Sequence, residues 1–339
     1  MKTFRNLTIA ALLATTAPAV AIAETELIFN SYLPPFNGTF QTAIRDFSAA
    51  IMEESGGEIT ISIPDSSLAP ANRQYEMVRD GIADMAIVST GGVAQFVTFN
   101  EIAELPTMSP TSEAASVALW ETYNEFFKEH NELPGVVVLS THALVGRQIL
   151  SVSDYAPATP SDLEGAKIWA TADPLVAAAQ GMGGIPIDTE FSELQEYVTK
   201  GNLDVLFIGP GSADGANVLD RVTHITTIPG GLGSISFFVF INEDTWNGMN
   251  EDEQAAMMRA AEDLPRRTGA KGDAEELEVA EVVAGIPSTM PEGEALEAFN
   301  AILAPQIDDW MARAAEKGLE DPQAAVDFYR AVLARELDM

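Results

Sequence analysis

The chain has 339 residues, with 51 acidic and 18 basic side chains that give a formal net charge of −33, and it has no cysteine. This charge argues against nucleic acid and anionic lipid surfaces as partners, because both would repel the protein. Without cysteine, a closed transition-metal site is not expected. The fold also cannot rely on disulfides, so its stability must come from a hydrophobic core. About 300 residues are enough to form one.

Residues 1–23 have the pattern of a secretory signal peptide. Lys2 and Arg5 precede a largely apolar run of small residues that ends at Ala23 with a small-x-small sequence. A membrane anchor is the alternative, but it needs about 18 or more strongly apolar residues, and threonines and a proline interrupt this run. We therefore expect cleavage near Ala23, a periplasmic protein and no direct insertion into a membrane.

Short apolar runs alternate with longer helical patterns in the rest of the chain. Apolar runs predict seven strands, at 24–33, 58–64, 82–90, 135–142, 166–172, 203–209 and 235–242. Helical patterns are found at 39–57, 71–80, 111–129, 174–181, 189–200 and 211–220, and throughout the C-terminal third from 250 onward. This alternation favours an α/β fold with largely parallel sheets. No flexible linker is present, so two domains would have to be joined by strands or helices that cross between them.

The sequence shows no catalytic or metal-binding signature. It lacks G-x-G-x-x-G at the start of a helix, H-E-x-x-H and G-x-S-x-G, and its three histidines are scattered. We therefore expect no catalytic residues, no metal and no cofactor, and this profile favours binding over turnover. Two alternatives from other classes remain: a secreted hydrolase whose serine, histidine and acid come together only on folding, and an exported structural or chaperone protein without saturable affinity for a small molecule.

Six stretches occur in a characteristic order along the chain. They are PDSSLAPANRQYEMVRDGIADMAIVST, EIAELP, VGRQILS, TPSDLEGAKIWA, TEFSELQEYVTKGNLDV and VFINEDTWNGMNEDEQAAM. Together they resemble the periplasmic solute-binding proteins of TRAP transporters, of the dicarboxylate-binding (DctP) type. The resemblance implies a two-lobed periplasmic-binding-protein fold that closes on a small organic acid and delivers it to the TRAP membrane permease subunits.

The resemblance also implies how the chain is divided. Lobe I would comprise 24–144 and 235–274, and lobe II would comprise 145–234 and 275–339, with crossing strands and a long helix between them. Pro265, Gly269 and Gly272 lie inside this expected helix. Because proline costs about 3 kcal/mol in a helix interior, we expect the helix to be kinked or split there.

Family members usually hold a substrate carboxylate with two arginines, and this chain matches only one of them. Arg147 in VGRQILS occupies the place of one arginine, whereas Trp169 stands where the other usually follows D-L-x-G-x-K-I. Arg147 is therefore the expected anchor for an anionic group. The resemblance also implies that Phe191 and Ile208 line the site, and the C-terminal ends of the predicted strands 24–33 and 82–90 add Tyr32 and Ser89. Each of these residues except Arg147 has an ordinary alternative in the core, in a turn or on the surface.

Broad apolar walls around one cation favour a particular class of solute. A compact dicarboxylate or a sugar acid would leave its second polar end unpaired against Trp169 and Ile208, at a cost of about 1–3 kcal/mol per group. We therefore predict an aromatic or hydrophobic monocarboxylate. Clustered aromatic rings also bind quaternary ammonium ions, so a zwitterion or quaternary amine is the alternative ligand.

Overall fold

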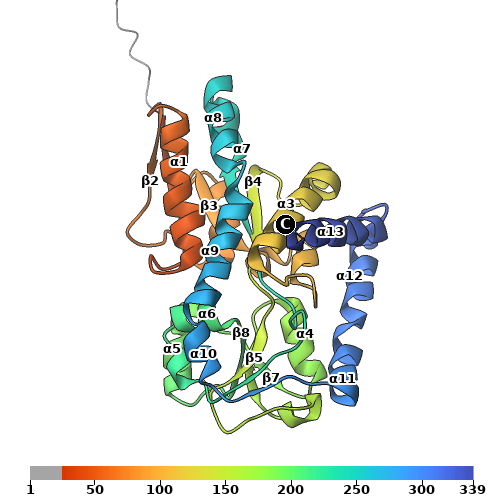
Figure 1. Cartoon of the computed structure of the whole chain (residues 1–339). Helices are drawn as coiled ribbons and strands as arrows, with labels where there is room; N and C mark the ends of the chain where they lie inside the picture. The colour runs from red at the N-terminus through yellow and green to blue at the C-terminus, as the bar shows by residue number, and fades with distance from the viewer. Residues whose placement is uncertain (1–24, 339) are drawn as a thin grey trace, which may run out of the picture.

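The computed structural model describes residues 25–338, which form two lobes, each built around one β-sheet (Figure 1). The first sheet has the strand order β2-β1-β3-β10-β4 and the second has the order β11-β9-β5-β8-β6-β7. The predicted two-lobed α/β architecture is confirmed. The predicted signal peptide, residues 1–23, lies outside the described residues.

All strands of the first sheet were predicted from the sequence. They are β1 (Thr25–Asn30), β2 (Ile59–Ser62), β3 (Met85–Ser89), β4 (Val136–Ala143) and β10 (Ser236–Asn242). Strand β1 is parallel to β2 and β3, whereas β10 is antiparallel to both β3 and β4. Every residue of β10 is buried, which explains its continuous apolar sequence.

The second sheet contains several short strands that the sequence did not reveal. Its strands are β5 (Gln148–Ser151), β6 (Lys167–Trp169), β7 (Ile185–Ile187), β8 (Val205–Ile208), β9 (His224–Thr226) and β11 (Ser288–Thr289). Only β6 and β8 were predicted. Strand β6 is parallel to β7 and β8, but β5 is antiparallel to β8 and β9. Both sheets are therefore mixed, because β5 and β10 enter their sheets after the chain has crossed between the lobes.

Helices cover the faces of both sheets (Figure 1). The α-helices are α1 (Phe47–Glu54), α2 (Gln74–Arg79), α3 (Ser112–Thr122), α4 (Asp173–Gly181), α5 (Leu194–Thr199), α6 (Pro210–Gly215), α7 (Glu243–Gly248), α8 (Glu251–Ala261), α9 (Leu264–Glu278), α10 (Ala280–Ala284), α11 (Gly293–Leu303), α12 (Pro305–Glu316) and α13 (Pro322–Leu337). A π-helical segment, η1 (Phe40–Asp46), leads into α1. Among residues 25–338, no helix has both the length and the apolar composition needed to cross a bilayer.

The long connecting helix is split, as Pro265 predicted. Figure 1 shows α8, α9 and α10 following one another from the first lobe to the second. Pro265 lies in the first turn of α9, where its missing N–H group breaks no helical hydrogen bond. A Cβ atom on Gly269 would lie 2.5 Å from the Cα atom of Glu113, and one on Gly272 would lie 2.8 Å from the Oγ atom of Ser112. These glycines therefore allow α9 to approach the start of α3 closely.

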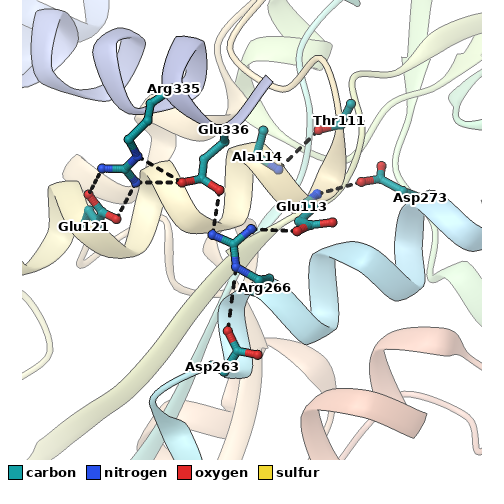
Figure 2. Close-up of polar contacts among 9 residues, drawn as sticks. All are labelled: Thr111, Glu113, Ala114, Glu121, Asp263, Arg266, Asp273, Arg335 and Glu336. Carbon is teal, nitrogen blue, oxygen red and sulfur yellow. Dashed lines mark hydrogen bonds and ion pairs between the residues drawn. The ribbon is translucent and has the colours of Figure 1, made fainter. Parts of the chain in front are cut away.

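Polar contacts made by Arg266 and Asp273 fix α9 to the first lobe (Figure 2). The Asp273 carboxylate accepts hydrogen bonds from the backbone N–H groups of Ser112 (2.7 Å) and Glu113 (2.9 Å), so it caps α3. Arg266 donates to Glu113 of α3 (2.7 Å) and to Glu336 of α13 (2.6 Å). Helices α3, α9 and α13 are thus joined through one arginine.

The last two helices contact the first lobe, whereas the family resemblance implies that 275–339 belongs to the second. Trp310 of α12 and Tyr329 of α13 are fully buried in a cluster with Phe99 and Leu119 of the first lobe. The Nε1–H group of Trp310 also donates to the carbonyl oxygen of Thr98 (2.9 Å). Their large aromatic side chains find apolar partners on α3 and its neighbours, so the chain returns to the first lobe. The exact lobe boundaries remain a prediction.

Candidate functional site

A cavity of about 250 Å³ lies between the two lobes, slightly smaller than the roughly 300–1,000 Å³ that is typical of ligand pockets. Tyr32, Ser89 and Phe237 line it from the first lobe. Arg147 and Trp169 are among the residues that line it from the second lobe. Ser89 and Trp169 are the last residues of β3 and β6, so the cavity lies where parallel strands end, a common place for ligands in α/β proteins.

Arg147 supplies a buried cation with unused hydrogen-bond donors. Its residue surface is only 2% exposed, and its Nη1 atom donates to the Oγ atom of Ser212 in α6 (3.1 Å). Within residues 25–338 its Nε atom has no hydrogen-bond partner. Burial lowers the pKa of Arg147 to about 10, and the nearby acidic side chains of Glu276 and Glu104 oppose this shift. The guanidinium is therefore charged at neutral pH and is suited to bind an anion.

Trp169 belongs both to the core and to the wall of the cavity. It is 3% exposed and packs in a hydrophobic cluster with Leu194 and Leu206, yet it also lines the cavity. Its Nε1–H group donates to the carbonyl oxygen of Thr189 (3.0 Å). This bond satisfies the indole nitrogen and fixes the orientation of the ring. The core interpretation and the site interpretation of Trp169 are therefore compatible.

Tyr32, Ser89 and Phe191 also line the cavity, as the sequence predicted. Burial raises the pKa of Tyr32 to about 12, and hydrogen bonds with Ser89 lower it by a smaller amount. The phenol is therefore protonated at neutral pH and can donate a hydrogen bond. Phe191 is half-buried and packs against the cluster that holds Trp169. Whether these residues contact a solute stays a prediction.

Ile208 is the one predicted site residue that does not line the cavity. It is fully buried at the end of β8, pairs with Gln148 of β5 and packs in the same hydrophobic cluster as Trp169. All four residues of β8 are buried, so this strand is enclosed on both faces and Ile208 has a core position. The geometry gives no support for a contact between Ile208 and a solute.

The sequence analysis did not select several other lining residues, among them Phe237, Ser212, Asp188 and Glu190. Asp188 and Glu190 follow β7, and their side chains reach solvent as well as the cavity. Burial raises the pKa of Glu190, and the nearby charges of Asp188 and Glu193 add to this effect. The cavity therefore combines a buried cation with two carboxylates at its edge. In the described part of the chain, no three histidine or acidic side chains are grouped as a metal site.

Comparison with known proteins finds similarity along most of the chain. The model of the DctP family, described as bacterial extracellular solute-binding protein, family 7, matches residues 29–314. A relative from Comamonas testosteroni, the outer membrane transporter protein TsaT, is 28% identical over 97% of this chain and 98% of its own length.

Solved structures share the same fold. A TRAP periplasmic solute-binding protein from Bordetella bronchiseptica with bound (R)- and (S)-mandelate is 23% identical, with a TM-score of 0.87 and coverage of 92% of this chain and 99% of that one. A TRAP solute-binding protein from Rhodoferax ferrireducens with copurified benzoate is 19% identical, with a TM-score of 0.80 and coverage of 93% and 99%. DctP7 from Bordetella pertussis, a receptor that binds pyroglutamic acid, is 19% identical, with a TM-score of 0.78 and coverage of 90% and 99%.

Proposed function

Because this chain belongs to the DctP family of bacterial extracellular solute-binding proteins, family 7, we propose that it captures an aromatic or hydrophobic monocarboxylate and delivers it to a TRAP membrane permease. Members of this family are periplasmic binding proteins and not enzymes. The alternative of a secreted hydrolase is therefore dropped. Cleavage of the signal peptide near Ala23 remains part of the proposal.

The observation that carries the proposal is the buried Arg147 in a cavity with aromatic walls. A solute carboxylate would accept charge-assisted hydrogen bonds from the guanidinium, including its Nε–H group, which has no partner within residues 25–338. The rings of Trp169, Phe191 and Phe237 offer flat apolar surfaces to the body of the solute.

A second carboxylate on the solute would have no cation of its own. Arg147 is the one basic residue among those that line the cavity in the described chain, whereas Asp188 and Glu190 line it with negative charge. The mandelate and benzoate bound by the relatives from Bordetella bronchiseptica and Rhodoferax ferrireducens support an aromatic acid. The relative that binds pyroglutamic acid is evidence that this fold also admits an acid without an aromatic ring.

Asp188 and Glu190 favour a second candidate, a zwitterion or quaternary amine. Their carboxylates line the cavity together with Trp169 and Phe191, and a cation can bind both to aromatic faces and to carboxylates. Such a solute would place its carboxylate on Arg147 and its ammonium group toward Asp188 and Glu190.

A thermal-shift screen of the mature protein separates these candidates. The panel contains mandelate and benzoate as aromatic acids, succinate as a diacid, galacturonate as a sugar acid and glycine betaine as a zwitterion. A ligand at one hundred times its dissociation constant should add about 2.7 kcal/mol of stability. We expect an aromatic acid to give the largest increase in melting temperature. A larger shift from succinate or galacturonate would contradict it, and a shift from betaine alone would favour the second candidate.

A further inference from the structure

Glu104 lies in the EIAELP stretch, which the site described above does not use. It is the last residue of a 3₁₀ helix, η4 (Phe99–Glu104), and it is only 1% exposed. Its Oε1 atom accepts hydrogen bonds from the backbone N–H group of Ser236 (2.8 Å) and from the Oγ–H group of the same residue (2.9 Å). Its own carbonyl oxygen accepts from the N–H group of Ser234 (3.0 Å). Glu104 thus holds the segment that leads into β10 by both its side chain and its backbone.

This segment is one of two extended segments that cross between the lobes, 144–147 and 233–236, and the two are bonded to each other. The N–H group of Leu144 donates to the carbonyl oxygen of Ile235 (2.9 Å), and the N–H group of Arg147 donates to that of Gly233 (2.7 Å). The position of the Arg147 backbone therefore depends directly on the position of Gly233.

Gly233 is also in close contact with Glu104. Its φ angle is +142°, and a Cβ atom at this position would lie 2.5 Å from the carbonyl oxygen of Glu104. Only glycine allows this approach. The residues after it, Ile235 and Phe237, line the cavity. Glu104 therefore contacts a segment that supports both the Arg147 backbone and one wall of the cavity.

We propose that Glu104 is a positioning residue for the solute site, because it clamps the crossing segment 233–236 and thereby fixes the Arg147 backbone and the Phe237 ring. The expected effect on solute affinity rests on the proposed function. The contact between Glu104 and segment 233–236, which we call the clamp, does not depend on it. Glu104 acts through Arg147 and Phe237, and it does not line the cavity.

The charges around Glu104 indicate which substitution should preserve the clamp. Burial raises the pKa of Glu104 to about 8; the bonds from Ser236 lower it, while the charges of Glu101 and Asp173 raise it further. The positively charged side chain near Glu104 is that of Arg147. The carboxyl is thus largely neutral at pH 7, and its hydrogen bonds from Ser236 need an oxygen acceptor but no charge. The amide oxygen of Glu104→Gln can provide that acceptor.

Hydrogen exchange of the solute-free protein tests the clamp. Glu104→Ala should speed amide exchange in segments 144–147 and 233–237 by about tenfold, because the buried Ser236 N–H group loses its acceptor. Glu104→Gln should stay within about twofold of the wild type at these amides. Glu101→Ala is the matched control, because Glu101 lies on the same helix and is also buried, but pairs with Arg313 of α12 (2.8 Å). If Glu104→Ala does not fold, Ser236→Ala should accelerate exchange of the same amides to a smaller degree.

Mandelate binding, measured by calorimetry, tests the link to the site. Glu104→Ala should weaken mandelate binding by about tenfold, and Glu104→Gln should restore it. Equal exchange of 233–237 in Glu104→Ala and Glu101→Ala would overturn the clamp, whatever mandelate does. Faster exchange with wild-type mandelate affinity would overturn the positioning role. If the wild type binds none of the acids in the screen and exchange still changes as expected, the proposed function fails while the clamp is supported.

Discussion

The Nη1 atom of Arg147 lies 3.1 Å from the Oγ atom of Ser212, across the cavity wall of the second lobe. This bond uses one of several N–H donors of the guanidinium and holds the side chain in place, while the Nε–H group stays unpaired within residues 25–338. An arginine that is already positioned loses little conformational entropy when it binds an anion. Ser212 therefore holds the Arg147 side chain in place for the proposed solute carboxylate.

Replacement of Arg147 should remove most of the affinity for an anionic solute. Arg147→Ala is expected to weaken binding of mandelate or benzoate by about 2–5 kcal/mol, since the solute carboxylate would be buried without its cation. Arg221→Ala is a suitable control, because Arg221 lies in the same lobe on the exposed surface beside Asp220. Calorimetry should show unchanged affinity for the control. A folded Arg147→Ala protein with wild-type affinity would remove Arg147 from the site.

Substitution of Trp169 should affect both stability and binding, because the ring is in the core and faces the cavity. Trp169→Ala should cost about 3–5 kcal/mol of stability, as large-to-small changes in a core do. Trp169→Phe keeps an aromatic ring but loses the hydrogen bond to the Thr189 carbonyl oxygen. We therefore expect it to lower the free energy of unfolding by about 1 kcal/mol. Urea unfolding gives the stabilities, and calorimetry gives the affinity for an aromatic acid. An affinity for benzoate that is unchanged in a folded Trp169→Ala protein would show that the ring does not contact the solute.

Gly269 should tolerate no side chain, because α9 touches α3 there. A Cβ atom would lie 2.5 Å from the Glu113 Cα atom, and a backbone contact of this kind cannot be relieved by a rotamer change. Gly269→Ala should therefore destabilise the protein by about 1–3 kcal/mol. Gly248→Ala at the end of α7 is the control, because nothing lies within 4 Å of a Cβ atom there, and it should be neutral or stabilising by up to about 1 kcal/mol. Equal stabilities of the two variants in urea would argue against a close contact.

The sequence predicted those parts of the fold whose signal is local. Strand β10 was evident because it is buried along its whole length and reads as one apolar run. Strands β7, β9 and β11 have only two or three residues, too few to show a periodic pattern. The partners of α12 and α13 were also not predictable, since an amphipathic helix shows that it has an apolar face but not which surface covers it.

The candidate site was predicted in part for the same reason. Arg147 and Trp169 could be selected because the family resemblance marks their positions, in VGRQILS and after D-L-x-G-x-K-I. Phe237 was missed because an aromatic residue within an apolar strand looks the same whether it faces the core or a cavity. Ile208 was chosen by correspondence with a family position, but the burial of β8 depends on its neighbours β5 and β6, which no single stretch of sequence specifies.

Two buried carboxyl groups should make the protein less stable as the pH rises. Glu132 accepts hydrogen bonds from the N–H groups of Thr98 (2.7 Å) and Phe99 (3.1 Å), and burial raises its pKa to about 7 from an ordinary value of 4.5. Burial raises the pKa of Glu104 to about 8. Because the folded state binds these protons more tightly than the unfolded state, their contribution to stability is present below pH 4.5 and is lost as the pH rises through 7 and 8.

Urea unfolding between about pH 5 and pH 8 measures this loss. Each group can contribute a slope of at most about 1.4 kcal/mol per pH unit. Glu104→Gln cannot titrate but keeps an acceptor for Ser236, so its stability should fall less steeply with pH than that of the wild type. The double variant with Glu132→Gln should be flatter still, because the new amide would also keep an oxygen for the N–H groups of Thr98 and Phe99. If Glu104→Gln folds and retains the wild-type slope over this range, the Glu104 carboxyl is already ionised at the acidic end of the range and its burial does not hold it neutral.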